Sequence, residues 1–570
     1  MDVKSNYERW LASPRVSEED KALLRGMNEE ELSDAFFKNA EFGTGGMRGV
    51  LGPGTNRINE HTIGRVTVGF GLYLQKAFPA DGLSRGVVIS HDNRFHSRDF
   101  TLQSADILSR MGFKVYIFDD LRSTPELSFA VREKKCCGGI MITASHNPKN
   151  NNGYKIYDEK GCQFVPSLVD GLLEILSGLP DELSYEVPEA KKKGKVITLP
   201  ASIDEKYHAL VKKVQVHPEL DKKGFKVVYS PQHGASYEGA MAVFTSLGYE
   251  IIPVAEQCVH DPNFGATKSP NPEVASAWDL PLEYARRYDA DLVVMTDPDG
   301  DRCGLAYRAK DGEFRRLTGN ESGALLIDYI LGEKKKMGVL PENPVMYDTI
   351  VTSSLGRKVA ESYGVKTESF LTGFKFIGNR IGYYEDQGER PTFVFGYEES
   401  YGCLAADFVR DKDGIQAILL YTEMALFHHL RGHDLGEMFD ALQQRFGYHH
   451  AVLKDIYFEG MEGSATMRRL MGGLRESPCK EFVGIPVASL ADYLTDVHTY
   501  ADGRKEEIVG LPASDVLKFF LSDGSTICVR PSGTEPKVKF YIEVVSPSKD
   551  GLDEKAENIY NDLLRQCGIK

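Results

Sequence analysis

Three carboxylates alternate in the sequence DPDGDR, at Asp297, Asp299 and Asp301. Unit charges about 4 Å apart repel by roughly 4 kcal/mol at a surface-like dielectric, so three converging carboxylates require a cation between them. Oxygen ligands of this kind favour Mg²⁺ or Ca²⁺. A calcium loop of the EF-hand type is excluded, because Arg302 and Arg308 stand where that loop needs glycine and glutamate. A solvated acidic turn is the structural alternative.

A serine that could carry a covalent group stands in TASHNP, at Ser145, directly after a predicted strand. A serine at the end of a strand can be held rigidly, and the cation of Lys155 would favour a phosphate attached to it. We expect the Ser145 side chain to be exposed. The alternative is a turn serine that bonds its own backbone, since Ser, Asn and Pro are common in turns.

Two further loops have the composition of anion-binding loops. RPSGTEPK, from Arg530 to Lys537, lies between two predicted strands and offers a guanidinium, two hydroxyls and the backbone N–H groups around a glycine. A turn with incidental hydroxyls is equally compatible with it. GTGGMRG, which contains Arg48, is too rich in glycine for a helix and could bring backbone close to a ligand. It is not a dinucleotide fingerprint, because no strand precedes it and arginine replaces the last glycine.

The elements that must position these loops form a repeated pattern. Short β-branched runs alternate with amphipathic helical stretches three times, which is typical of parallel-sheet α/β units. The expected strands are 86–90, 114–118 and 139–143, then 226–230, 250–254 and 291–296, then 344–350, 366–371 and 392–395. The third strand of each unit runs into a different loop, namely TASHNP, DPDGDR and GYEESYG. Ligands of open α/β sheets bind beyond the carboxyl ends of the strands, so each unit presents one unusual loop where a site belongs.

The sequence predicts four domains. Three similar α/β domains with mixed or parallel sheets are expected at 1–205, 206–318 and 319–447, and an α+β domain at 448–570. The stretch from 178 to 206 is rich in proline and charge and indicates the first boundary. After residue 447 the strand and helix alternation loosens, which sets the last domain apart.

Composition narrows the possible partners and compartment. The 570 residues carry a formal net charge of -15, which speaks against general binding to nucleic acid or anionic membranes. Nine cysteines without a CxxC pair favour a reducing, cytoplasmic location over a disulfide framework or zinc site. No signal peptide or membrane-spanning run is visible, so we expect a soluble protein.

The loops TASHNP, DPDGDR, GYEES and RPSGTEPK occur in an order that resembles the α-D-phosphohexomutase superfamily. LTGFKFIGN, DFVRDKDG and KSPNPE strengthen the likeness to its long phosphoglucomutase branch. The resemblance implies four domains around a central cleft. It also implies that Ser145 carries the phosphoryl group and holds one Mg²⁺ together with the three aspartates.

The resemblance further assigns roles around the expected site. Lys155 is a proton-transfer candidate, and Lys412 is a second one, because the histidine that shorter relatives place after Glu-x-Ser is replaced here by Tyr401-Gly402-Cys403. His146 and Arg48 are expected in the catalytic centre. The substrate-binding residues implied are Thr372, Gly373, Lys375, Glu398, Ser400 and Arg302, with Arg530, Ser532, Gly533 and Thr534 as a clamp for the distal phosphate.

The activity implied is the interconversion of glucose 1-phosphate and glucose 6-phosphate, with glucose 1,6-bisphosphate as intermediate and activator. A phosphomannomutase or phosphopentomutase of the same chemistry stays open, because one carboxylate at position 398 could bind several sugars. A non-catalytic sugar-phosphate-binding protein on the same fold is an alternative of another class. The presence of Ser145 and three aspartates argues against it, since simple binding needs neither. A phosphate-releasing hydrolase is the third alternative. The expected partners are small sugar phosphates.

Overall fold

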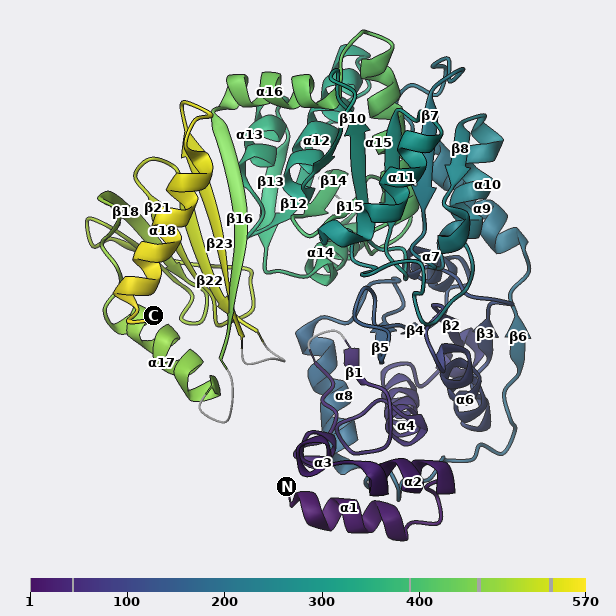
Figure 1. The fold of residues 1–570 in the computed structure, drawn as a ribbon. Helices are drawn as coiled ribbons and strands as arrows, with labels where there is room; N and C mark the ends of the chain where they lie inside the picture. Colours follow the sequence, from purple (N-terminus) through teal and green to yellow (C-terminus); the bar gives the residue numbers. More distant parts are fainter. Residues whose placement is uncertain (1, 44–45, 389–390, 459–462, 533–536, 570) are drawn as a thin grey trace. The chain divides into compact units, whose positions relative to one another are not determined.

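The computed structural model describes residues 2–43, 46–388, 391–458, 463–532 and 537–569 (Figure 1). The chain forms two compact units. The first comprises Met1–Ser322, Met337–Val345 and Phe374–Leu435, and the second comprises Gly323–Lys336, Met346–Gly373 and Gly436–Lys570. Within the described residues, every helix is too short or too polar to cross a membrane.

The first sheet of the first unit is mixed and has the order β1-β5-β4-β2-β3-β6, which can be followed in Figure 1. Its strands are β1 (Gly46–Val50), β2 (Val87–His91), β3 (Val115–Ile117), β4 (Gly138–Ile142), β5 (Asn151–Tyr157) and β6 (Val196–Thr198). The three strands expected from the sequence, β2, β3 and β4, pair in parallel, and β5 pairs antiparallel with β4 and β1. The charged stretch after residue 178 supplies the edge strand β6, which pairs with β3.

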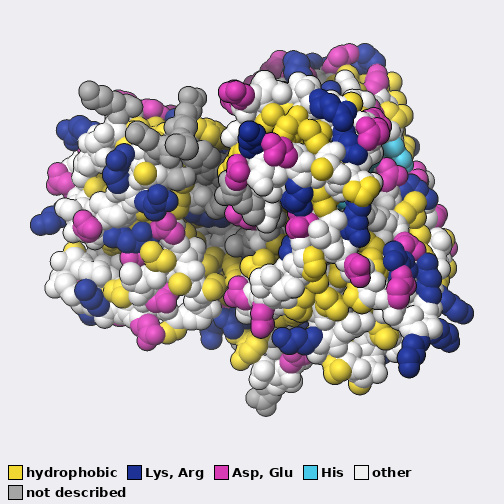
Figure 2. All heavy atoms as spheres, turned by 90° about the horizontal axis from the view of Figure 1, so that it is seen from below, with side chains coloured by type: hydrophobic (Ala, Val, Ile, Leu, Met, Phe, Trp, Pro, Cys, Tyr) yellow, Lys and Arg dark blue, Asp and Glu magenta, His cyan; other side chains and the backbone are white. Residues whose placement is uncertain are grey.

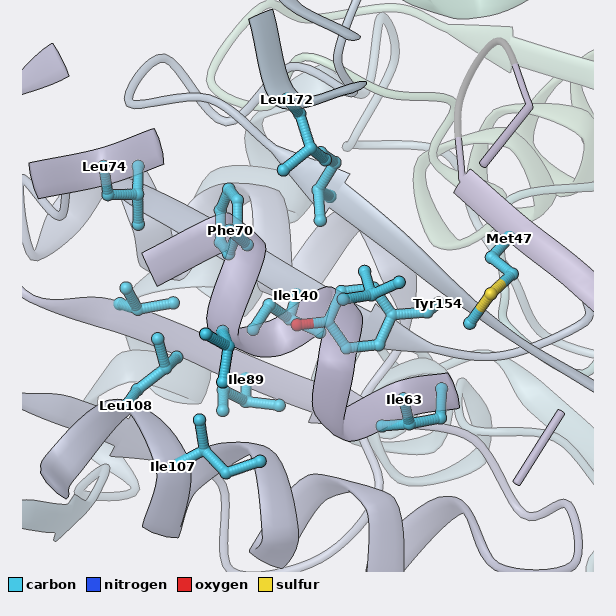
Figure 3. Packing of buried hydrophobic residues seen from close by; sticks show 14 of the residues in the cluster. Met47, Ile63, Phe70, Leu74, Ile89, Ile107, Leu108, Ile140, Tyr154 and Leu172 are labelled. Atoms are coloured by element: carbon cyan, nitrogen blue, oxygen red, sulfur yellow. The ribbon is translucent and has the colours of Figure 1, made fainter. Parts of the chain in front are cut away.

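Three helices cover one face of this sheet through a common apolar core. They are α4 (Glu60–Ala77), α6 (Ser97–Arg110) and α8 (Pro166–Gly178). Figure 3 shows Phe70 and Leu74 of α4 among Ile89 and Ile140 of the sheet. All five residues of β2 are buried, as expected of a central parallel strand covered on both faces. Helix α7 (Thr124–Glu133) covers the other face, and its N-terminus has a capping box and a proline.

Three N-terminal helices have a small core of their own, formed by Trp10, Leu24 and Phe36 with their neighbours. They are α1 (Val3–Ala12), α2 (Glu18–Gly26) and α3 (Glu29–Phe36), and the short α5 (Gly82–Arg85) follows α4. The indole of Trp10 donates to Glu182 at 2.9 Å. The stretch from 178 to 206 is therefore anchored at two places, at Glu182 and at β6.

The second sheet of the first unit has the order β11-β10-β9-β7-β8, in which β10-β9-β7-β8 repeats the arrangement of β5-β4-β2-β3 in the first sheet. Its elements are α9 (Ser202–Val211), η1 (Lys212–Val214), β7 (Lys226–Ser230), α10 (Tyr237–Leu247), β8 (Glu250–Pro253), η2 (Ala255–Gln257), η3 (Ala275–Trp278), α11 (Asp279–Arg287), β9 (Leu292–Thr296), β10 (Cys303–Arg308) and β11 (Phe314–Leu317). Strands β7, β8 and β9 are parallel, as predicted, and β10 returns antiparallel to β9.

The rest of the first unit carries a helix pair and a short hairpin: α14 (Phe374–Gln387), β14 (Thr392–Glu398), β15 (Gly402–Leu404) and α15 (Gly414–His429). Strands β14 and β15 pair antiparallel. All residues of α15 from Gly414 to Phe427 are buried. A helix that is apolar around its whole circumference belongs inside a protein, so α15 is a central element of this unit.

The second unit contains elements of the third predicted α/β repeat and a large antiparallel sheet. The former are α12 (Gly319–Lys336), β12 (Pro344–Thr349) and α16 (Leu435–Phe446), which all begin in the first unit, with α13 (Ser354–Ser362) and β13 (Lys366–Phe370). The large sheet has the order β16-β23-β22-β21-β18-β19-β20, with β17 beside β18.

The strands and helices of this C-terminal part are β16 (Tyr448–Tyr457), α17 (Gly463–Glu476), β17 (Glu481–Phe482), β18 (Ile485–Asp492), β19 (Val497–Tyr500), β20 (Lys505–Glu507), β21 (Leu517–Leu521), β22 (Thr526–Pro531), β23 (Lys537–Ser546) and α18 (Leu552–Gln566). Figure 1 shows α18, in yellow, across the strands, and Ile559 and Leu563 of this helix share a core with Phe519 and Phe540. The predicted final helix and the two strands around RPSGTEPK are confirmed.

The surface carries both signs of charge. On the face seen in Figure 2, Lys and Arg are interspersed with Asp and Glu among the described residues. All nine cysteines lie in the described part of the chain and are free thiols.

Candidate active site

The serine loop, residues 143–151, follows β4 and holds Ser145 in the left-handed region at φ 52°. The N–H of Ser145 donates to Thr143 Oγ1 at 2.8 Å, which fixes the turn. The Ser145 hydroxyl donates to Asp297 Oδ2 at 2.7 Å. Ser145 is only 2% exposed, so the expectation of an exposed side chain is wrong. The hydroxyl faces the aspartates of the next domain, which the local sequence could not show.

The aspartate loop, residues 297–302, follows β9 at the matching place of the second sheet. Asp297 Oδ1 accepts from the N–H groups of Asp301 and Arg302 at 3.1 and 3.0 Å, so one oxygen closes the loop while the other meets Ser145. Gly300 provides the left-handed residue of the turn at φ 71°. The three carboxylates offer ligand atoms that all lie within 4.8 Å of one another.

This cluster of buried carboxylates is electrostatically incomplete. Burial and the charges of Asp299 and Asp301 raise the pKa of Asp297 well above its ordinary value. Asp299 Oδ1 and Asp301 Oδ1 are buried and have no hydrogen-bond partner among the described residues. Unpaired carboxylate oxygens in a dry site are costly unless a cation meets them. The donor set, made of hard oxygens only, fits a divalent metal ion such as Mg²⁺.

Two buried lysines from distant parts of the sequence lie next to the aspartates. Lys155 of β5 donates to Asp299 Oδ2 at 2.6 Å and to Asp301 Oδ2 at 3.4 Å. Lys412 lies 3.2 Å from Asp301 Oδ2 and 3.2 Å from Asp411 Oδ1. Burial lowers the pKa of Lys155, but the carboxylates outweigh it and raise the pKa above its ordinary value, and the same holds for Lys412. Both lysines are therefore charged in this structure and meet at Asp301.

The remaining sequence-predicted central residues have different surroundings. His146 Nδ1 lies 3.2 Å from the Ser145 hydroxyl, and burial together with Arg302 and Arg48 holds the pKa of His146 well below its usual range. Arg302 forms an ion pair with Glu273. Arg48 is exposed on β1, where it pairs in register with Gly153. His146 is therefore a neutral neighbour of the serine.

The sugar loop expected from the sequence follows β14. Glu398 is buried and its charge helps to raise the pKa of both Lys412 and Arg302, so it lies close to the aspartate loop. Ser400 is half-buried in the turn after it, and Lys375 is buried in the first turn of α14. A Cβ at Gly402 would lie 2.1 Å from Lys412 Cδ, so this glycine leaves the passage that the lysine side chain needs.

Four of the expected substrate residues belong to the second unit, and two lie outside the described residues. Thr372 and Gly373 precede α14, and Arg530 and Ser532 stand at the end of β22, where the Ser532 N–H donates to the Lys537 carbonyl at 2.7 Å. Gly533 and Thr534 fall in the part that the structure does not describe.

Several residues that brace the site were missed from the sequence. Thr124 at the start of α7 donates its N–H to the Asp299 carbonyl at 2.8 Å and its hydroxyl to Asp299 Oδ2 at 3.1 Å. The N–H of Ala235 donates to the Pro298 carbonyl at 2.8 Å. Arg94 bonds the serine loop, and Glu273 holds Arg302. The strand pattern could have pointed to Arg94 and Ala235. They follow β2 and β7, and the carboxyl ends of these strands lie at the same sheet edge as those of β4 and β9, which carry the serine and aspartate loops.

Four family models match the chain in order. They are the models of Phosphoglucomutase/phosphomannomutase, alpha/beta/alpha domains I, II and III, at residues 39–179, 205–311 and 318–446, and of the C-terminal domain at 485–560. Their succession defines a four-domain protein of the mutase class. The chain belongs to the phosphoglucomutase/phosphomannomutase family, because these matches together span more than half of its length.

Curated relatives agree with this assignment. A phosphoglucomutase of Staphylococcus epidermidis is 36% identical over 550 residues, which cover 95% of this chain and 97% of the relative. A phosphoglucomutase of Staphylococcus aureus strain USA300 is 34% identical over 537 residues, covering 94% and 95%.

Solved structures show the same fold at lower identity. The open form of parafusin, a phosphoglucomutase from Paramecium, has a TM-score of 0.69 at 20% identity and covers 93% of this chain and 95% of its own. A phosphoglucomutase/phosphomannomutase family protein from Burkholderia thailandensis has a TM-score of 0.67 at 18% identity, covering 93% and 98%.

Proposed function

We propose that this chain is a phosphoglucomutase that interconverts glucose 1-phosphate and glucose 6-phosphate through a phosphorylated Ser145. The observation that carries the proposal is the Ser145 hydroxyl, 2.7 Å from Asp297 Oδ2, in a cluster of three carboxylates. A serine nucleophile beside a site for a divalent cation is what phosphoryl transfer needs, because its catalysis is mainly positioning and charge stabilisation.

The metal site would be formed by Asp297, Asp299 and Asp301 together with a phosphate oxygen on Ser145. Mg²⁺ bound there supplies positive charge that offsets the negative charge of the phosphoryl group in transfer. The chain's own cations, Lys155, Lys412 and Arg302, are already gathered at the same carboxylates. They would hold the phosphoryl oxygens and the sugar, while the burial of Ser145 excludes water.

The transfer balances within the site. The P–O bond to Ser145 Oγ breaks, a P–O bond to the free sugar hydroxyl forms, that hydroxyl loses its proton, and Ser145 Oγ gains one. We assign both proton movements to Lys155, whose charged ammonium is bonded to Asp299: it donates a proton to Ser145 Oγ and is restored by the proton that the sugar hydroxyl loses. Lys412 is the alternative. The product of this half-reaction is glucose 1,6-bisphosphate, which must reverse its ends before it returns its other phosphate to Ser145.

The substrate contacts follow the loops. Glu398 and Ser400 would bind sugar hydroxyls, and Arg48 and His146 would line the reacting phosphate. Lys375, Thr372 and Gly373 are further candidates for binding the substrate. Arg530, Ser532, Gly533 and Thr534 would clamp the phosphate that does not react. Such a clamp recognises the geometry and charge of a phosphate more than the identity of the sugar, so it could accept either end of the bisphosphate. Nine free thiols suit the reducing cytoplasm proposed as its location.

The test compares Ser145→Ala with Ser109→Ala, a serine that is also buried and whose hydroxyl donates to the Asp106 carbonyl of its own helix. Both variants are assayed on 1-phosphates of glucose, mannose and ribose, with inorganic phosphate measured in parallel. We expect Ser145→Ala to lose more than about a thousandfold in kcat with its fold intact, and Ser109→Ala to keep it. Full activity of folded Ser145→Ala would refute the proposal. A preference for another sugar, or phosphate release that matches turnover, would replace the substrate or the reaction type.

A further inference from the structure

The Arg94 side chain donates hydrogen bonds to several backbone carbonyls of the serine loop. Arg94 follows β2, and its side chain is completely buried. Its Nη2 donates to the carbonyls of Ser145 at 2.6 Å and Asn147 at 2.5 Å, and its Nη1 donates to those of Pro148 at 2.8 Å and Asn151 at 2.9 Å. One guanidinium therefore holds four carbonyls of a loop whose key residue has a left-handed backbone.

Asp92 ties Arg94 to the turn that carries the nucleophile. Its Oδ2 forms an ion pair with Arg94 Nε at 3.2 Å and accepts from the Thr143 hydroxyl at 2.6 Å. The same Thr143 oxygen accepts the N–H of Ser145 at 2.8 Å. The result is a continuous chain of contacts from the Arg94 guanidinium through Asp92 and Thr143 to the backbone on both sides of the Ser145 Cα.

The segment around Arg94 also contacts the second α/β domain, which carries the aspartate loop. The Arg94 guanidinium lies 5.1 Å from the centre of the Phe264 ring. Asn93 Nδ2 donates to the Asp261 carbonyl at 3.0 Å. The segment that holds the serine loop is thus fastened to the domain of the serine's carboxylate partners. A displacement here would move the Ser145 hydroxyl relative to Asp297.

We propose that Arg94 is a positioning residue for the phosphoryl carrier, an inference that rests on the proposed function of Ser145. The planar fork of arginine places several N–H donors in one plane, and a lysine ammonium cannot reach four separate carbonyls in this way. Non-glycine residues keep a left-handed backbone only where the surroundings enforce it. Arg94 supplies that enforcement, so its loss affects transfer to and from Ser145 more than it affects the metal site or the binding of the sugar.

The experiment compares Arg94→Lys with Arg85→Lys in the full-length protein. Arg85 is a matched control, because it also donates to two loop carbonyls of the same domain, those of Lys135 at 3.0 Å and Cys136 at 3.1 Å, away from the serine loop. Five quantities are measured: kcat and KM on glucose 1-phosphate, the Mg²⁺ concentration for half activation, the rate at which glucose 1,6-bisphosphate phosphorylates Ser145 as followed by intact mass, and hydrogen exchange of residues 143–151.

For Arg94→Lys we expect kcat and the rate of Ser145 phosphorylation to fall together by about a hundredfold, since misplaced reacting groups cost factors of this size. KM and the Mg²⁺ requirement should stay within about threefold, and exchange in the serine loop should accelerate. Arg85→Lys should change none of these. If Arg94→Lys does not fold, Asp92→Asn, which keeps the guanidinium but weakens its anchor, should show the same pattern with a smaller loss.

A normal kcat in folded Arg94→Lys, or in Asp92→Asn if that variant has to be used, overturns the inference. So does a parallel loss of kcat, Mg²⁺ affinity and KM, which would indicate general damage. If the wild-type protein turns over no sugar phosphate, the proposed function fails instead. The exchange measurement then still decides whether Arg94 holds the serine loop.

Discussion

The serine loop and the aspartate loop occupy the same place in two sheets of the same topology. Each follows the third parallel strand, β4 or β9, and leads into an antiparallel return strand, β5 or β10. Their internal supports differ. The aspartate loop is closed by its own Asp297 carboxylate, whereas the serine loop has its carbonyls gathered by a separate side chain, Arg94. One topology has thus been fitted with a nucleophile in one copy and with metal ligands in the other.

The comparison shows that neither loop is complete alone. The Ser145 hydroxyl donates a hydrogen bond to Asp297, and Lys155 of the first sheet donates one to Asp299, which follows the second sheet's strand β9. Thr124, also from the first domain, donates to the Asp299 carbonyl. The fold positions each loop, and the contacts between the two domains of the first unit make the site.

Removing divalent metal should cause the largest loss of activity. It should also distinguish the role of the aspartate loop, which binds the metal, from that of the serine loop, which carries the phosphate. Without a cation, the three aspartates and a phosphoserine repel one another, so turnover in a chelator should stop completely. The phosphate on Ser145 should stay, as intact mass would show. Mg²⁺ should restore activity better than Ca²⁺, whose larger and looser shell positions oxygens less well. Equal rates of turnover in chelator and in Mg²⁺ would show that the aspartate loop does not act as a metal site.

The two lysines should differ, although both are charged and meet at Asp301. Lys155→Met should lower kcat by roughly a hundred- to ten-thousandfold, the usual range for a group that transfers a proton. Lys412→Met should raise KM more than it lowers kcat, because Lys412 lies with Asp411 and Glu398 on the side of the sugar loop. Steady-state kinetics on glucose 1-phosphate measures both.

Lys193→Met is the control for these variants, since the exposed Lys193 side chain forms an ion pair with the surface carboxylate of Asp106, away from the aspartate loop. It should match the wild type. The opposite split, with kcat carried by Lys412 and KM by Lys155, would exchange the two assignments and place the proton transfer on the third domain.

The smallest effect concerns the helix that braces the aspartate loop. Glu126 is buried in the cap of α7, and burial raises the pKa of Glu126 to about 7. Between about pH 4.5 and 7 the folded protein binds this proton and the unfolded chain does not. Stability should therefore fall by roughly 3 kcal/mol across that window as pH rises. Glu126→Gln should remove this part of the loss.

Calorimetry at pH 5 and pH 8 checks this prediction. The thermal midpoint of the wild type should drop more than that of Glu126→Gln, while kcat of the two at pH 7 should agree. Parallel drops in the midpoint would show that Glu126 does not carry this pH dependence.

Much of this arrangement could be predicted from the sequence. The strands before TASHNP and DPDGDR are short, fully buried runs of mostly apolar residues, so these runs and the rule for carboxyl ends were enough to place both loops. The clustering of Asp297, Asp299 and Asp301 followed from their alternation alone.

What could not be predicted depends on contacts between residues far apart in the chain. The buried Ser145 hydroxyl donates to Asp297, 152 positions away, and the guanidinium of Arg94 donates to carbonyls 51 to 57 positions away. The edge strand β6 lies in a stretch whose proline and charged residues indicated only a domain boundary. The composition of this stretch does not reveal that it pairs with β3. Local patterns locate elements, whereas these contacts arise only when the sheets assemble.

A phosphoserine shuttle requires that Ser145 carry a phosphate before the enzyme can act on glucose 1-phosphate, so protein stripped of this phosphate tests the shuttle. Enzyme whose Ser145 is unphosphorylated, as confirmed by intact mass, is assayed on glucose 1-phosphate alone and then with a trace of glucose 1,6-bisphosphate. We expect no activity in the first assay, and in the second full activity together with one phosphate on Ser145. Full activity of the stripped enzyme, with no bisphosphate formed at any stage, would rule out the phosphoserine shuttle.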